Sequence, residues 1–160
     1  MSAAVVVDDE EEGASRVPYR VRILIVEDNE DSREMMAEVL RQTGDPIIAL
    51  AETGEEGLQQ LRSGAYDFIF TDIGLPGVSG LEMLDQATHE GLLLGSEIVV
   101  VCSASYAFRQ AVIARGERWL PKPVDPEKML ELVRAWSRPE PRESGPELSN
   151  AIDKEPANDV

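Results

Sequence analysis

Residues 68–76 read FIFTDIGLP, and this stretch decides how the rest of the chain is organised. Its first four residues are of the type found in a strand that is buried on both faces. They run directly into the carboxylate of Asp72, and Gly74 and Pro76 then end the strand. In an open α/β sheet, chemistry collects outside the carboxyl ends of the strands, so we expect Asp72 to face the active crevice.

Apolar runs of strand length alternate with helical patterns on both sides of this stretch. We expect strands at residues 21–26, 47–51, 66–71, 97–102 and 118–120. We expect helices at residues 32–42, at 53–64, after residue 80, at 106–115 and at 125–136. Five strand–helix repeats predict an α/β fold, in which a parallel sheet carries helices on both faces.

The chain has 160 residues and a formal net charge of -16, which suits one acidic domain. Residues 1–19 contain an acidic block and no periodicity, so we expect a disordered leader there. Residues 137–160 combine four prolines with many charges, which predicts a disordered tail without an effector domain. The folded domain is therefore expected at residues 20–136.

Composition also limits the partners and the compartment. No basic stripe interrupts the acidic sequence, and binding to nucleic acid depends on Lys and Arg that neutralise phosphates. The longest apolar runs are far shorter than a membrane span, and no basic signal-peptide start is present. The single cysteine, Cys102, fits a reducing compartment. We therefore expect a soluble, cytoplasmic protein without nucleic-acid or membrane partners.

Polar groups follow four of the five expected strands, and the ends of these strands lie side by side in a doubly wound sheet. Clustered carboxylates repel one another, and Mg²⁺ relieves that repulsion through oxygen ligands. An aspartate can act as a nucleophile and form an aspartyl-phosphate, while an ammonium stabilises the transferred charge. The set consists of Glu27-Asp28, Asp72, Ser103-Ala104 and Lys122-Pro123.

In this order, the set resembles the receiver domain of bacterial two-component response regulators, over residues 20–136. The resemblance implies a flavodoxin-like, five-stranded parallel sheet with strand order 2-1-3-4-5. It implies that Asp72 is the phosphoacceptor, and that the donor is a histidine kinase or a histidine phosphotransfer protein. Phosphorylation would then change the affinity for a downstream protein that the sequence does not identify.

The resemblance also assigns roles around the phosphoacceptor. Mg²⁺ would be held by Glu27, Asp28 and Asp72, and by the backbone carbonyl of Gly74. The Ser103 hydroxyl and the Ala104 N–H would bind phosphoryl oxygens beside the ammonium of Lys122, and the Lys122–Pro123 bond would be cis. Ser103 and Trp119 would form the switch that carries the signal to the surface.

Two features depart from the pattern of the family. The interval from Ser103 to Lys122 is a few residues shorter than in most receivers, so the fourth helix or its loops must be trimmed. The usual tyrosine or phenylalanine of the fifth strand is Trp119 here. Both departures fall on the surface that family members use for signalling, so phosphoryl acceptance is expected and the usual output mechanism is open.

Two other functions compete with signalling. A haloacid-dehalogenase-type phosphatase needs a second acid two positions after its nucleophile, where this chain has Gly74. A receiver-like docking module that works without phosphorylation stays open, but it is the weaker interpretation because the acids and Lys122 are all present. The only chemistry expected of a receiver is self-catalysed phosphoryl acceptance and autodephosphorylation, so we do not expect an enzyme.

Three further residues have simple structural interpretations. His89 is expected in an exposed loop, because no helical phospho-acceptor pattern surrounds it. Cys102 is expected to be a small core residue rather than a nucleophile. Trp136 is expected to belong to the buried face of the last helix.

Overall fold

The computed structural model describes residues 19–136, which form one α/β domain. All neighbouring strands pair in parallel, in the order β2-β1-β3-β4-β5, which confirms the predicted sheet and its strand order. The strands are β1 (Arg22–Val26), β2 (Ile47–Ala51), β3 (Phe68–Asp72), β4 (Ile98–Ser103) and β5 (Arg118–Pro121).

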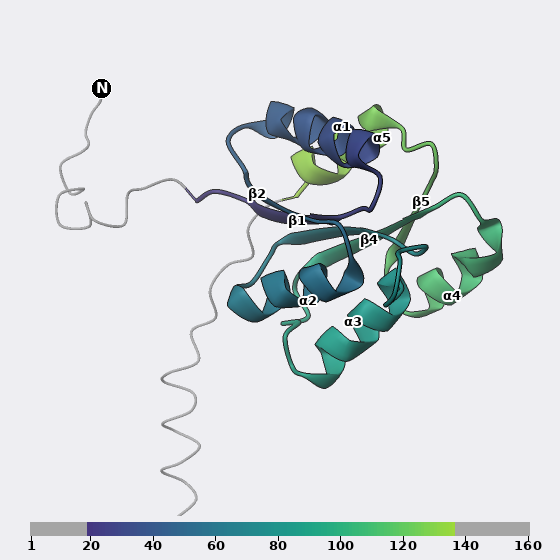
Figure 1. The fold of residues 1–160 in the computed structure, drawn as a ribbon. Coiled ribbons are helices and arrows are strands. Elements are labelled where there is room, and N and C mark those ends of the chain that lie inside the picture. The colour runs from purple at the N-terminus through teal and green to yellow at the C-terminus, as the bar shows by residue number, and fades with distance from the viewer. Residues whose placement is uncertain (1–18, 137–160) are drawn as a thin grey trace, which may run out of the picture.

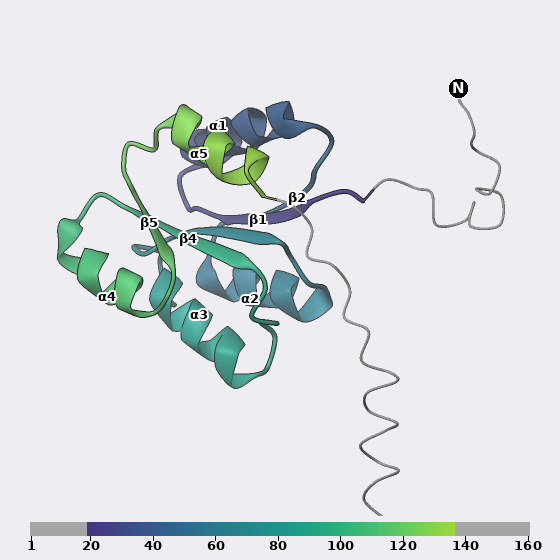
Figure 2. The ribbon, with the colours of Figure 1, turned by 180° about the vertical axis from the view of Figure 1, so that it is seen from behind.

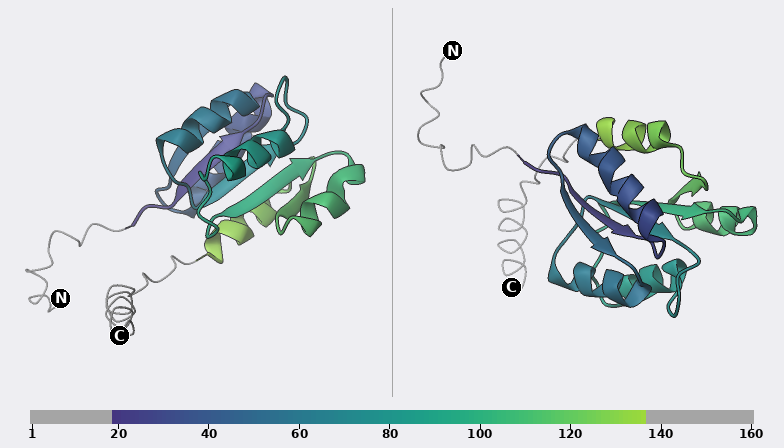
Figure 3. Two further views of the ribbon diagram at one scale, coloured as in Figure 1. Left: turned by 90° about the horizontal axis from the view of Figure 1, so that it is seen from below. Right: turned by 45° about the horizontal axis from the view of Figure 1, so that its top comes forward.

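Five α-helices cover the two faces of this sheet. Helices α1 and α5 lie on one face, and α2, α3 and α4 lie on the other, as the opposite views in Figures 1 and 2 and the tilted views in Figure 3 show. Within residues 19–136, no helix has both the length and the apolar character needed to cross a membrane. The helices are α1 (Glu30–Leu40), α2 (Gly54–Ser63), α3 (Gly80–His89), α4 (Arg109–Ala114) and α5 (Pro126–Arg134).

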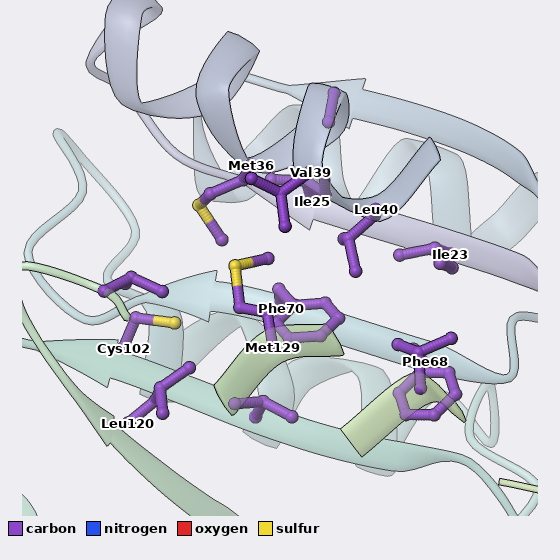
Figure 4. Packing of buried hydrophobic residues seen from close by; sticks show 14 of the residues in the cluster. Ile23, Ile25, Met36, Val39, Leu40, Phe68, Phe70, Cys102, Leu120 and Met129 are labelled. Atoms are coloured by element: carbon purple, nitrogen blue, oxygen red, sulfur yellow. The ribbon is translucent and has the colours of Figure 1, made fainter. Parts of the chain in front are cut away.

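Alternate residues of the central strands supply two separate hydrophobic cores, because successive side chains of a strand point to opposite faces. Phe68 and Phe70 of β3 pack under α1 and α5, with Met36 and Met129 from those helices (Figure 4). Ile69, between the two phenylalanines, packs on the other face. β3 is thus buried on both sides, as its unbroken apolar run indicates, and its end is held firmly in place.

Helix starts follow capping chemistry more closely than apolar spacing. α1 begins at Glu30, two residues before the expected start, because the side chain of Asn29 accepts a hydrogen bond from the N–H of Ser32. α5 begins at Pro126 after the N-cap Asp125, as expected. The region between β4 and β5 is compact: a 3₁₀ turn, Tyr106–Phe108, leads into an α4 of only six residues.

The two ends of the described domain meet at one corner. The ring of Tyr19 stacks on the ring of Trp136 with 6.2 Å between centroids, and its hydroxyl donates a hydrogen bond of 2.7 Å to Asp67. Tyr19 therefore packs on the domain that was expected at residues 20–136. The predicted disorder of residues 1–18 and 137–160 lies outside the described residues.

Candidate functional site

Three carboxylates gather at the carboxyl end of the sheet. β1 and β3 are adjacent and pair Val26 with Thr71, so the residues just after Val26 and Thr71 lie side by side at the same end of the sheet. Glu27, Asp28 and Asp72 each place a carboxylate oxygen within 4.8 Å of the other two. Glu27 is buried, Asp72 is partly buried and Asp28 is exposed, so the cluster opens to solvent on one side.

Lys122 reaches this cluster from the end of β5. Its Nζ donates hydrogen bonds to Glu27 Oε1 at 2.9 Å and to Asp72 Oδ2 at 3.0 Å. The backbone N–H of Lys122 donates to the carbonyl of Ser103, and the Lys122–Pro123 bond is cis, the isomer that the resemblance implied. Burial of the ammonium opposes its charge, but the hydrogen bonds to Glu27 and Asp72 outweigh burial and raise the pKa of Lys122.

The donor set has the chemistry of a magnesium site. Three carboxylates and one ammonium leave two negative charges, and all the offered ligand atoms are oxygens, which Mg²⁺ prefers. Gly74 lies beside the cluster, since its N–H donates to Asp72 Oδ1 at 3.3 Å. The predicted ligands are therefore together, and the assignment of each one stays a prediction.

Ser103 is the last residue of β4 and is buried at the neighbouring strand end. Its Oγ accepts a hydrogen bond of 3.0 Å from the N–H of Ser105, so the hydroxyl is held by its own loop. Ala104 follows it and is exposed. The structure thus places both residues one strand away from Asp72, because β3 pairs Asp72 with Cys102.

Two residues that support the acids were missed by the sequence reasoning. Arg33 is buried, and its guanidinium donates to the carbonyl of Glu27 at 2.9 Å, which fixes the backbone at the first acid. Gly80, the first residue of α3, lies so close to the carbonyl of Asp72 that a Cβ there would clash with it. Apolar periodicity gives no signal for a buried arginine, and a helix-opening glycine is not distinctive.

Trp119, the predicted switch partner, lies on the edge strand β5. Its side chain is partly buried, and the ring of Tyr106 lies 5.9 Å from it. The indole Nε1 is buried without a hydrogen-bond partner, alone among the side-chain polar atoms of the described residues. Among the described residues, no hydrogen bond joins the side chains of Trp119 and Ser103, so their coupling stays a prediction.

The remaining three interpretations have different outcomes. Cys102 is a core residue, as expected, and burial raises the pKa of its thiol to about 12. Trp136 packs against the core beside Phe68, but it follows α5 rather than lying within it. His89 is exposed, but it is the last residue of α3 and not a loop residue, since the helix continues through residue 89.

Comparison with known sequences gives a consistent family. The sequence profile of the response regulator receiver domain matches residues 23–134. A response regulator receiver protein of Anaeromyxobacter sp. strain Fw109-5 is 33% identical over 111 residues, which are 69% of this chain and 46% of that protein. DltR, a transcriptional regulatory protein of Streptococcus agalactiae, is 28% identical over 118 residues, 74% of this chain and 52% of its own. The chain spans about half the length of these curated relatives.

Solved structures agree with the profile. The N-terminal domain of an uncharacterized protein from Wolinella succinogenes is 34% identical, with a TM-score of 0.64 over 73% of this chain and 93% of that one. The chemotaxis response regulator CheY4 of Vibrio cholerae has a TM-score of 0.65 over 73% and 98%, and at 23% identity it supports the fold alone. Since the profile matches more than half of the residues, the chain belongs to the response regulator receiver domain family.

Proposed function

We propose that Asp72 accepts a phosphoryl group from a histidine kinase or a histidine phosphotransfer protein. Receiver domains act in phosphorelay signalling with such donors and bind Mg²⁺ at an acidic site. The observation that carries the proposal is the position of Lys122, whose Nζ lies 3.0 Å from Asp72 Oδ2 and 2.9 Å from Glu27 Oε1. This lysine and the three-carboxylate cluster are the parts that phosphoryl transfer needs.

The chemistry is a transfer between two proteins. A carboxylate oxygen of Asp72 forms a bond to phosphorus while the phosphorus–nitrogen bond of the donor phosphohistidine breaks, and its electron pair leaves with the histidine. Lys122 stabilises the negative charge of the transferred group, and Ser103 and Ala104 bind its oxygens. Glu27, Asp28, Asp72 and the Gly74 carbonyl would hold Mg²⁺, and the ion would supply further positive charge when bound.

We propose that the output is a protein contact. The face of β4, β5 and α5 carries Trp119 at an edge strand, where the ring of Tyr106 lies 5.9 Å from the indole. A rearrangement of Ser103 towards the phosphoryl group and of Trp119 towards the vacated space is a local change that biases a two-state element. In this proposal the chain acts in the cytoplasm as a receiver, with no chemistry beyond phosphoryl acceptance and autodephosphorylation.

The test is phosphorylation of the full chain by a small phosphodonor, such as acetyl phosphate, with Mg²⁺. Intact-mass measurement should show one added phosphoryl group, which is absent in Asp72→Asn and without Mg²⁺. Asp31→Asn is the matched control, because Asp31 is an exposed acid of the first turn of α1 outside the three-carboxylate cluster. Label retained by Asp72→Asn would contradict the assignment, and an unlabelled native chain would favour a phosphorylation-independent docking module.

A further inference from the structure

Two adjoining hollows lie along the edge of the sheet where β5 meets α5. One has a volume of about 330 Å³ and is lined by Trp119, Leu132 and Trp136 among others. The second, of about 470 Å³, extends towards Tyr106. The two share Trp119, Leu120 and Lys128, so they form one surface, which we call the edge groove.

The edge groove gathers basic side chains that have no acidic partner. Among the described lysines and arginines, four side chains make neither an ion pair nor a side-chain hydrogen bond. Three of them line the groove, which contains one acid, Glu131. In a chain of 31 acids and 15 bases, unpaired bases on an apolar surface indicate an acidic and partly apolar ligand. The four bases are Arg109, Arg118, Lys128 and Arg134.

The N-terminal segment starts from one end of this groove. Trp136 lines the groove, and the ring of Tyr19 stacks on it. Residues 8–12 are five consecutive acids, DDEEE, and residues 5–7 before them are three valines. The acids lie 7 to 11 positions before Tyr19, and an extended chain of that many residues is about 25 to 40 Å long. α5, with nine residues, is only about 13 Å long, so the acids can reach Lys128 near its far end.

We propose that residues 5–12 dock in the edge groove of their own chain, with the acids on Arg109, Arg118 and Lys128 and the valines against Trp119 and Leu132. A short linker gives a local concentration in the millimolar range, so a contact of millimolar affinity is occupied about half of the time. The tail at residues 137–160 starts at the same corner, but its six acids are spread among three bases. The leader therefore has the stronger charge complementarity.

This docking needs no phosphorylation, because it involves no residue of the carboxylate site. It has a consequence that rests on the proposed output face: a partner that binds there has to displace the leader. Most of the attraction is between exposed charges, which salt screens, so raising the salt concentration should weaken the docking.

The experiment uses paramagnetic relaxation in the full chain with a spin label on Ser2→Cys. Cys102 does not compete for the label, since it is buried and its thiol has a pKa of about 12. Amide signals of β5 and α5 should lose most of their intensity, because a nearby spin label dominates their relaxation even in a contact that is occupied half of the time. Signals of α2, on the other face, should be retained. Acrylamide quenching gives a second measurement, because both tryptophans of the chain line the groove.

Matched variants separate docking from simple proximity. Neutralising the leader, with Asp8→Asn, Asp9→Asn, Glu10→Gln, Glu11→Gln and Glu12→Gln, should restore the signals and increase quenching, and so should Arg118→Gln with Lys128→Gln. Arg134→Gln should change neither, because Arg134 is equally unpaired but does not line the groove.

Three outcomes would overturn the proposal. Attenuation that persists in the neutralised leader would mean that no charge-dependent docking exists. Attenuation that appears when spin-labelled chains are mixed with unlabelled ¹⁵N chains would show a second copy in the groove. Quenching that responds to neutralising all six acids of the tail, and not to the leader variant, would show that the C-terminal tail is the occupant. The six changes are Glu140→Gln, Glu143→Gln, Glu147→Gln, Asp153→Asn, Glu155→Gln and Asp159→Asn. Because none of these measurements involves phosphorylation, failure here leaves the role of Asp72 untouched.

Discussion

The carboxylate site and the edge groove differ in how their charged side chains are paired. In the carboxylate site, Lys122 contacts Glu27 and Asp72 at 2.9 and 3.0 Å, so the ammonium is held by the domain itself. In the groove, Lys128 makes no ion pair with any described residue. The first region is organised by internal contacts before any ligand arrives. The groove is also formed without a ligand, but its basic side chains have no partner in the described domain and can pair with one. Only six positions of the sequence separate Lys122 from Lys128.

The largest expected effect is from Lys122→Met. This change leaves the buried Glu27 beside Asp72 without a counter-charge, so we expect a loss of about 2 kcal/mol in the free energy of unfolding, below the range for a fully buried pair. For a domain of this size that corresponds to a fall in Tm of about 8 °C. Thermal unfolding measured by circular dichroism tests it, and added Mg²⁺ should recover part of the loss.

Lys128→Met is the control that makes this comparison decisive. It removes the same charge from an exposed position without a partner, so Tm should change by no more than about 2 °C. Equal losses in the two variants would mean that the pairing of Lys122 contributes nothing specific.

The second prediction compares two glycines beside Asp72. A Cβ at Gly80 would clash with the Asp72 carbonyl, whereas a Cβ at Gly74 meets no atom within 4 Å. Gly80→Ala should therefore destabilise the domain by about 1–2 kcal/mol, in the lower part of the range for overpacking. It should also slow phosphorylation, because it displaces the end of β3.

Gly74→Ala should be as stable as the native protein. It also keeps the backbone carbonyl that is the predicted magnesium ligand. Urea unfolding and phosphorylation rates of the two variants would test this contrast. A stable Gly80→Ala variant with normal phosphorylation would show that the close approach of α3 does not position Asp72.

The third prediction concerns the tryptophan of the groove. The ring of Tyr106 lies 5.9 Å from that of Trp119, so Tyr106→Ala should make the indole more exposed and shift its emission to the red in a Trp136→Phe background. Phe108→Ala is the control, because Phe108 makes no described ring contact with Trp119. Phosphorylation should shift the emission to the blue if the ring turns inward, and an unchanged spectrum in fully phosphorylated protein would exclude the ring as the switch.

The smallest effect is expected at a charge pair outside both regions. Hydrogen bonds from Arg62 and then Gln86 lower the pKa of Glu90 to about 2 from 4.5. Because the pKa is lower in the folded state, the pair stabilises the domain above pH 4.5, and this stabilisation is lost as the pH falls towards 2. The native chain should be slightly more stable than Glu90→Gln at pH 6, with the difference closing below pH 3. A difference independent of pH would assign the effect to packing.

The sheet was predictable because β1 to β4 each contain an unbroken apolar run, and the end of β3 is visible directly in residues 68–76. The grouping of Glu27, Asp72 and Lys122 was predictable because parallel strands bring their carboxyl ends together. The role of Arg33 was not, because burial of a guanidinium depends on a carbonyl contributed by another segment. Residue spacing also could not predict that the bases of the groove lack ion pairs, because pairing depends on distances between different helices and strands.

The adjacency of Tyr19 and Trp136 makes this domain portable. With both ends at one corner, the domain can be inserted into a surface loop of a host protein without separating the two sides of that loop. The same closeness favours circular permutation, in which a short linker joins the old ends and a new opening is cut at another loop. Whatever is fused to either end begins its path beside Trp136, so fusion partners attached to opposite ends would compete for the same space.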